Sequence, residues 1–137
     1  MIKTIVIGYD DSEASRRALE RGAALARAFA SKLVVTSVAP VSASPARSLG
    51  ADPTDTAADH LAELATARAY LEGEGLQADY IEALGHPGES ILAAASERSA
   101  DMIIVGTREP GLVQRLLGQS VSDTVSHHAH CDVLIVH

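Results

Sequence analysis

The sequence predicts an α/β domain in which helices cover both faces of a parallel, five-stranded β-sheet. Short, almost continuous apolar segments alternate with longer segments whose apolar residues recur at helical spacing. The apolar segments do not alternate regularly with polar residues, which is typical of strands buried on both faces. Neither an internal repeat nor a linker interrupts the pattern, so residues 1–137 are expected to form a single, doubly wound domain.

The first half of the chain is predicted to hold two strands and two helices. Strands are expected over residues 2–9 and 32–40. Residues 12–30 lie between them and carry a helical stripe made of Ala14, Ala18, Gly22, Leu25 and Phe29. Residues 40–54 are rich in Pro, Ser, Ala and Gly, and predict a long loop that is either a lid or an exposed surface segment. The second helix is expected over residues 55–74, with a stripe made of Ala57, Leu61, Leu64 and Leu71.

The second half repeats the alternation. A third strand is expected over residues 76–84, and Pro87 then lies where the first residue of a helix is favourable for proline. Residues 101–107 predict a fourth strand that runs into a glycine-containing loop. A further helix should begin near Ser120, and residues 132–137 close the sheet as the fifth strand.

Composition excludes several classes of partner. The formal net charge is −7 and the isoelectric point is near 5.2, so the surface repels nucleic acids and anionic membranes. No apolar run approaches the length of a membrane span. Cys131 is the single cysteine, which rules out a disulfide within the chain. Met1 leads directly into a strand rather than into a signal peptide, and we therefore expect a cytoplasmic protein.

Strong phosphate signatures are missing from the sequence. The only lysines, Lys3 and Lys32, begin strands, so no P-loop is present, and no GxGxxG dinucleotide fingerprint occurs either. Asp10 and Asp11 follow the first strand as a magnesium-binding pair does in phosphate-accepting receiver domains. The aspartate and lysine that those domains need after later strands are missing here. We expect either Asp11 or Ser12 to cap the next helix, which leaves the other for a ligand.

Two further patterns favour a structural reading over chemistry. The segment GQSVS resembles the GxSxG motif of hydrolases around Ser120, but it lacks the last glycine and follows a loop, so a helix cap is the better interpretation. A hydrolase that pairs Ser120 with His127 is kept as a remote alternative. His127, His128, His130 and Cys131 lie close together in sequence, yet helical geometry separates them. We therefore predict a polar helix end, no metal site and no catalytic residue.

The chain resembles the universal stress protein family along its whole length. The segments that carry the resemblance are IVIGYDDSEASRRAL, LVVTSV, GHPGESI and, above all, DMIIVGT together with RLLGQSVSDTVSHHAHCDVLIVH. The resemblance implies the strand order 3-2-1-4-5. It also implies a homodimer that pairs the last strands of two copies across a two-fold axis, which suits the apolar edge VLIV. No protein partner is identified.

Members of the family that bind ATP carry the motif G-x2-G-x9-G-[ST], and this chain matches it only in part. Gly106 matches the first glycine and Ser120 matches the hydroxyl residue, whereas Glu109 and Gln119 replace the other two glycines. Glu109 adds a negative charge beside the expected phosphates. At about 5 Å and an effective dielectric constant near 20, one such repulsion costs roughly 3 kcal/mol as an upper figure.

The resemblance implies a set of nucleotide-binding positions. Asp10 is expected near the ribose or adenine and Val38 is expected to contact adenine through its backbone, while Asp11 replaces a usual glycine. Phosphate is expected at Gly106, at the cation Arg108, and at the helix start formed by Gln119, Ser120, Val121 and Ser122.

The resulting hypothesis is a non-catalytic stress-response module with a degenerate cleft. It binds ATP or AMP weakly, with Mg²⁺ only alongside the nucleotide. The alternative is a dimeric interaction scaffold of the same fold that binds no nucleotide.

Overall fold

The computed structural model describes residues 1–37, 53–82, 86–107 and 121–137, with the side chains of residues 53–60 left out. The strands are β1 (Thr4–Tyr9), β2 (Lys32–Ser37), β3 (Ala78–Ile81), β4 (Met102–Gly106) and β5 (Asp132–Val136). All of them are parallel, and they form one five-stranded sheet in the order β3-β2-β1-β4-β5. This arrangement confirms the predicted sheet and its strand order.

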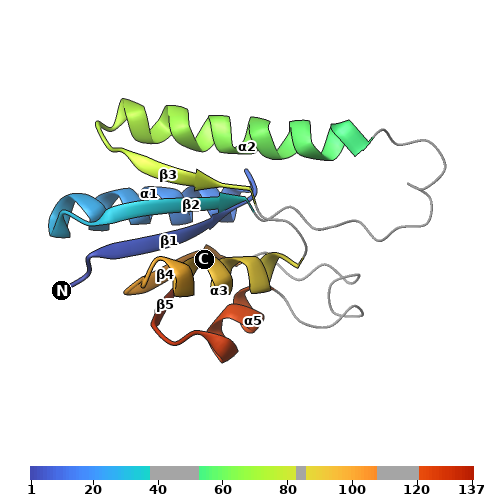
Figure 1. The fold of residues 1–137 in the computed structure, drawn as a ribbon. Coiled ribbons are helices and arrows are strands. Elements are labelled where there is room, and N and C mark those ends of the chain that lie inside the picture. The colour runs from blue at the N-terminus through green and yellow to red at the C-terminus, as the bar shows by residue number, and fades with distance from the viewer. Residues whose placement is uncertain (38–52, 83–85, 108–120) are drawn as a thin grey trace.

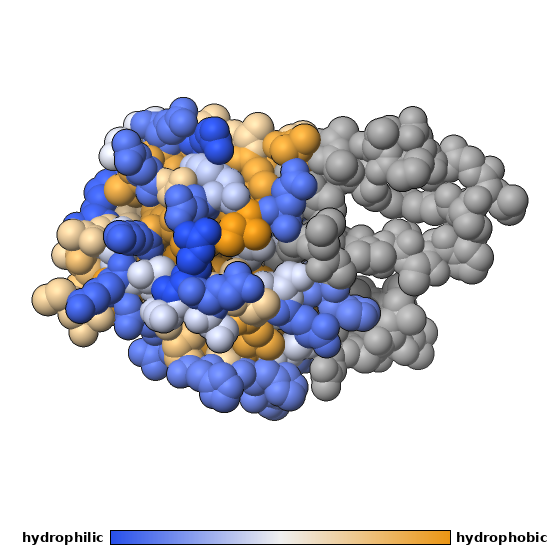
Figure 2. All heavy atoms as spheres, in the orientation of Figure 1, coloured by the Kyte–Doolittle hydropathy of each residue, from blue (hydrophilic) through white to orange (hydrophobic). Residues whose placement is uncertain are grey.

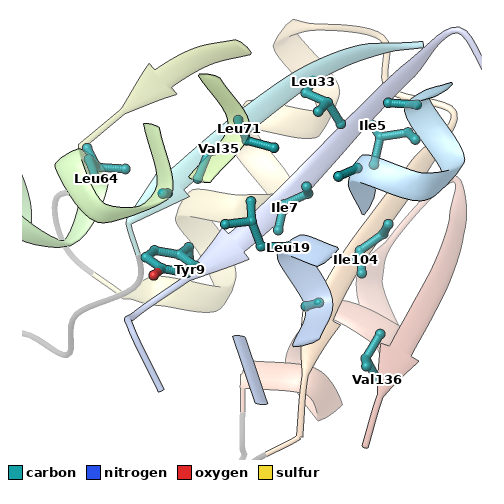
Figure 3. Packing of buried hydrophobic residues seen from close by; sticks show 14 residues of the cluster. Ile5, Ile7, Tyr9, Leu19, Leu33, Val35, Leu64, Leu71, Ile104 and Val136 are labelled. Atoms are coloured by element: carbon teal, nitrogen blue, oxygen red, sulfur yellow. The ribbon is translucent and has the colours of Figure 1, made fainter. Parts of the chain in front are cut away.

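Helices cover both faces of the sheet, as predicted (Figure 1). The helices within the described residues are α1 (Glu13–Phe29), α2 (Pro53–Gly73), α3 (Pro87–Glu97) and α5 (Val121–His128). Helices α1 and α2 share a hydrophobic cluster on one face with alternate residues of the strands, among them Ile5, Ile7 and Ile104. Figure 3 shows Leu19 of α1 and Leu71 of α2 in this cluster.

Helices α3 and α5 cover the opposite face. Their buried residues Ile91 and Val125 share a second cluster with Val6, Ile103 and Val105, which are the strand residues that point away from the first cluster. Because successive residues of a strand point to opposite faces, both sides of β1 and β4 are apolar. Apolar residues follow one another along these two strands because helices cover both faces of the sheet.

Helix starts follow the local signals in the sequence. The Oγ atom of Ser12 accepts a hydrogen bond from the backbone N–H of Ser15 at 3.2 Å, so Ser12, rather than Asp11, caps α1. Pro87 is the first residue of α3, as expected. No helix in the described residues is both long enough and apolar enough to cross a membrane.

Parts of the predicted helical stripes are wrong. Leu64 and Leu71 are buried, but Leu61 is 59% exposed, and Phe29 is 45% exposed. Leu25 is half-buried at the rim of the first cluster. The other three predicted positions of α1, Ala14, Ala18 and Gly22, are buried as expected. Ser15, Leu19, Ala23 and Ala26 complete the buried face of α1, most of which consists of small residues. Small side chains let the helix approach the sheet closely. On the face shown in Figure 2, hydrophilic residues are interspersed with hydrophobic ones.

Candidate functional site

The candidate site lies at the carboxyl ends of β1 and β4. These strands are neighbours, with Ile7 paired to Ile104, although β2 follows β1 in the chain. The strand order therefore reverses between β1 and β4, where doubly wound folds bind their ligands. The strand β1 ends at Tyr9 and is followed by Asp10, and β4 ends at Gly106. The fold thus brings Asp10 and Gly106, two of the predicted site residues, to the same edge of the sheet.

A chain of hydrogen bonds fixes the turn that carries Asp10. The Oδ1 atom of Asp10 accepts a bond of 3.0 Å from the backbone N–H of Ser12, and the N–H of Asp10 donates to Oγ of Ser15 over 3.3 Å. The Ser15 hydroxyl in turn donates to the carbonyl of Ser12 over 3.1 Å. The carboxylate of Asp10 is therefore held against the first turn of α1 before any ligand arrives.

Asp11 occupies a left-handed backbone conformation with φ of 62°. Glycine adopts this conformation without strain, which is a physical reason for the glycine that the resemblance leads us to expect at this position. The Asp11 side chain compensates by accepting hydrogen bonds from the Tyr9 hydroxyl at 2.7 Å and from Nε of Arg16 at 3.1 Å. Nη2 of Arg16 forms an ion pair with the same carboxylate oxygen at 3.1 Å.

This cluster of Tyr9, Asp11 and Arg16 shifts the titration of its members. The Arg16 guanidinium and, to a smaller extent, the Tyr9 hydroxyl lower the pKa of the Asp11 carboxyl. Burial raises the pKa of Tyr9 strongly, and its hydrogen bond to Asp11 raises it further. At neutral pH the cluster therefore consists of a neutral phenol, a carboxylate and a guanidinium. Tyr9 itself is 1% exposed and lies at the end of the first hydrophobic cluster (Figure 3).

Sequence reasoning missed Tyr9 and Arg16 as parts of this edge. Tyr9 carried one weak signal, because it is a rare aromatic residue at the end of a strand in a chain with only 3% aromatic residues. Arg16 carried none, since nothing in a helical pattern indicates which exposed cation reaches back to the preceding turn.

Gly106 is required by the packing of α1 against β4. A Cβ atom built on it would lie 2.5 Å from the carbonyl carbon of Ala14 and 2.6 Å from its oxygen. These neighbours are backbone atoms of the first turn of α1 and cannot swing aside. Among the described glycines, Gly75 is the one with positive φ, so Gly106 does not serve through a left-handed conformation. Its missing side chain lets α1 and β4 meet closely beside Asp10.

Residues that follow β4 and β5 tie this edge together. The backbone N–H of Thr107 donates to the carbonyl of Val136 at 2.9 Å, which extends the pairing of the two strands. Nε of Arg17 donates to the carbonyl of His137 at 3.0 Å, and the Thr107 hydroxyl lies 3.3 Å from Nδ1 of His137. The first turns of α1 are thereby linked to the ends of both strands.

The phosphate half of the predicted site is described in part. Val121 and Ser122 are the first two residues of α5, and both are half-buried. Val121 packs against the second hydrophobic cluster, so the helix start is anchored to the sheet. The remaining predicted positions, Val38, Arg108, Gln119 and Ser120, lie outside the described residues, as does Glu109.

The histidine-rich segment forms the end of a helix, as expected. His127 and His128 are exposed in the last turn of α5, and His130 is exposed beyond it. Within the described residues, no group of three or more His, Cys, Asp or Glu side chains is arranged to hold a metal ion. The remote hydrolase alternative depends on Ser120, which is one of the positions outside the described part.

Comparisons with known proteins agree with one another. The family model described as the universal stress protein family matches residues 1–137. A universal stress protein of Thermus aquaticus is 33% identical over 148 residues, which cover 99% of each chain. The crystal structure of a universal stress protein in complex with cAMP is 29% identical, with a TM-score of 0.75 and coverage of 99% of this chain and 97% of the other. A universal stress protein from Archaeoglobus fulgidus shares the fold with a TM-score of 0.76 at 21% identity, covering 100% and 95% of the two chains.

Proposed function

Because the chain belongs to the universal stress protein family, we propose that it is a non-catalytic stress-response module whose cleft binds an adenine nucleotide. The observation that carries the proposal is the placement of Asp10 and Gly106 at the ends of the neighbouring strands β1 and β4. This is the point of strand reversal at which doubly wound folds accept ligands. The relative with 29% identity was crystallised with cAMP, which supports the same class of ligand here.

The described residues suit the two ends of a nucleotide. A carboxylate accepts hydrogen bonds from ribose hydroxyls, and the backbone N–H of Ser12 holds the Asp10 carboxylate in place. The start of α5 at Val121 and Ser122 presents backbone N–H groups and the positive end of a helix dipole to phosphate. Gly106 ends β4, next to the turn that carries Asp10.

We propose a nucleotide with a single phosphate, such as AMP or cAMP, as the preferred ligand. Glu109 and Gln119 replace two glycines of the ATP-binding motif, so a triphosphate loses close backbone contacts and meets an added negative charge. ATP is expected to bind more weakly, and Mg²⁺ is expected only together with a nucleotide. The negative net charge of the protein does not attract an anion at long range, so the anion needs positive charge close to it. The start of α5 and Arg108 would supply that charge.

No catalytic step forms part of the proposal. The two carboxylates at the described edge, those of Asp10 and Asp11, already accept hydrogen bonds from the chain itself. Carboxylates that already accept hydrogen bonds suit the anchoring of a ligand rather than proton transfer.

We also propose a cytoplasmic location, because the single cysteine offers no disulfide within the chain.

The proposed module acts as a homodimer that pairs β5 with the same strand of a second copy. In the described residues β5 is the last strand on its side of the sheet, with β4 as its neighbour. Val133, Leu134 and Ile135 are only half-buried, and an exposed apolar edge of this kind favours pairing with another strand. Sedimentation velocity tests the dimer, and a monomer at micromolar concentration would contradict it. A dimer without any nucleotide affinity would favour the scaffold alternative.

Isothermal titration with AMP, cAMP and ATP tests the nucleotide site, with native mass spectrometry of the freshly purified protein as a second measurement. We expect binding of AMP or cAMP, and about tenfold weaker binding in Asp10→Asn, which loses the charge but keeps an oxygen for the N–H of Ser12. Asp79→Asn is the matched control, because Asp79 is exposed on β3 and pairs with Arg98. An absence of heat and of co-purified nucleotide would retire the proposal.

A further inference from the structure

The first turn of α3 contains a glycine that the nucleotide site does not explain. Gly88 belongs to the segment GHPGESI and is buried one residue after the start of α3. A Cβ atom built on it would lie 2.8 Å from Cγ2 of Thr124 and 2.9 Å from Cβ of Thr124. Separations below 3.0 Å are not tolerated without movement, so this glycine sets how closely α3 and α5 approach each other.

A displacement of Thr124 would also displace the start of α5, which belongs to the candidate site. It lies in the first turn of α5, three residues after Val121, with which that helix starts. Its β-branched side chain is stiff, and its Cβ atom cannot move without the helix. Val125, the next residue, is fully buried in the second hydrophobic cluster, which also includes Ile91 of α3. Figure 1 shows α3 and α5 next to each other on the same side of the sheet.

The contact joins two helix starts at the same edge of the sheet. In a parallel sheet each helix begins near the carboxyl end of the preceding strand, and α3 and α5 follow β3 and β4 in the chain. A shift of α5 away from α3 would therefore displace the backbone N–H groups of Val121 and Ser122. Backbone donors must lie within hydrogen-bond distance of a phosphate to bind it, so displacements below 1 Å matter.

We propose that Gly88 is a positioning residue for the phosphate end of the nucleotide site, acting through Thr124. This inference rests on the proposed function, since it names a residue that holds the same site in place. Gly88 does not contact the nucleotide; it permits the close approach that fixes the start of α5.

The experiment compares Gly88→Ala with the natural chain in two measurements. Isothermal titration with AMP is expected to show about tenfold weaker binding, because a displaced helix start loses phosphate contacts. Hydrogen exchange without ligand is expected to be faster at the amides of α5, including Ala129, whose N–H donates to the carbonyl of Val125 at 2.9 Å. Thr124→Ser removes Cγ2 but keeps the Cβ atom at 2.9 Å, so the double variant Gly88→Ala/Thr124→Ser should recover only a small part of both losses.

Gly73→Ala is the matched control. Gly73 is the last residue of α2, and a Cβ atom there would have no neighbour within 4 Å, so neither measurement should change. If the natural chain binds neither AMP nor cAMP, the proposed function fails and the role of Gly88 at the nucleotide site fails with it; hydrogen exchange then shows only whether Gly88 positions α5. Unchanged hydrogen exchange in α5 of Gly88→Ala, or unchanged AMP affinity in that variant, would overturn the inference.

Discussion

The hydroxyl of Tyr9 donates a hydrogen bond of 2.7 Å to the carboxylate of Asp11, two residues further along the chain. This bond, together with Arg16, accompanies a left-handed backbone conformation of Asp11 in the turn between β1 and α1. The turn after β1 thus has the positive φ that glycine favours, and the side-chain contacts of Asp11 stabilise it. Asp10 lies directly before Asp11, and its carboxylate accepts a separate hydrogen bond from the backbone N–H of Ser12.

The first prediction separates the two contributions of Asp11. Asp11→Gly loses the contacts to Tyr9 and Arg16 but adopts positive φ freely, whereas Asp11→Ala loses the same contacts and is also strained. We expect the glycine variant to be more stable than the alanine variant by roughly 1 kcal/mol in urea unfolding. Equal stability of the two variants would show that backbone strain at this turn is negligible.

The second prediction concerns the loss of stability in acid. The pKa of Asp11 is lowered by Arg16 and Tyr9, and the pKa of Asp101 is lowered by hydrogen bonds from the backbone N–H groups of Lys3 and Thr4. An unfolded aspartate titrates near pH 3.9, so in acid the unfolded chain takes up protons before these native carboxylates do. Their stabilising contribution is complete above about pH 5 and is lost as the pH falls through the lowered values.

Urea unfolding between about pH 3 and 7 measures this effect. The free energy of unfolding should fall with decreasing pH in the natural chain. In the double variant Asp11→Asn/Asp101→Asn, stability at neutral pH should be lower and the acid slope shallower. A slope unchanged by both substitutions would assign acid sensitivity to other carboxylates.

Most of the fold could be predicted, because helix caps and apolar runs are read from neighbouring residues. Parts of the site could not be predicted, because they depend on contacts between residues far apart in the sequence. Ser12 and Pro87 indicate where helices begin, and apolar runs indicate strands that are buried twice. The strand order came from the resemblance. Phe29 was assigned to the core wrongly, since helical spacing does not reveal where the sheet beneath a helix ends. The contact between Gly106 and Ala14 joins residues far apart in sequence, and no pattern indicates it.

The third prediction follows from that contact. Gly106→Ala should destabilise the protein by about 2 kcal/mol, because the new Cβ meets the backbone of Ala14. Ala14→Gly removes only one of the crowded atoms and leaves the carbonyl, so the double variant should not recover stability. Chemical denaturation measures both. Recovery in the double variant would show that the Ala14 side chain, rather than the backbone, sets the close approach.

Because Gly106→Ala disturbs the packing of α1 against β4, a loss of nucleotide binding in this variant alone would not demonstrate a contact between Gly106 and phosphate.

The last prediction tests the degenerate motif. Glu109→Gly/Gln119→Gly restores both missing glycines, which removes a charge beside the expected phosphates and two side chains from their approach. ATP affinity should rise by up to about a hundredfold, since one relieved repulsion is worth roughly 3 kcal/mol at most. AMP affinity should rise less, because AMP carries fewer phosphates. The natural chain and the variant are compared by isothermal titration in the presence of Mg²⁺.

Charge and bulk can be separated within that comparison. Glu109→Gln removes the charge and keeps the side chain, so it should recover most of the gain for ATP if repulsion dominates, and little of it if steric access dominates. Glu97→Gln makes the same change of charge at the exposed end of α3 and should leave both affinities unchanged. Equal gains from Glu97→Gln and Glu109→Gln would mean that overall charge, rather than the motif position, limits ATP binding. If ATP affinity does not rise in the double glycine variant, the replaced glycines do not determine which nucleotide binds.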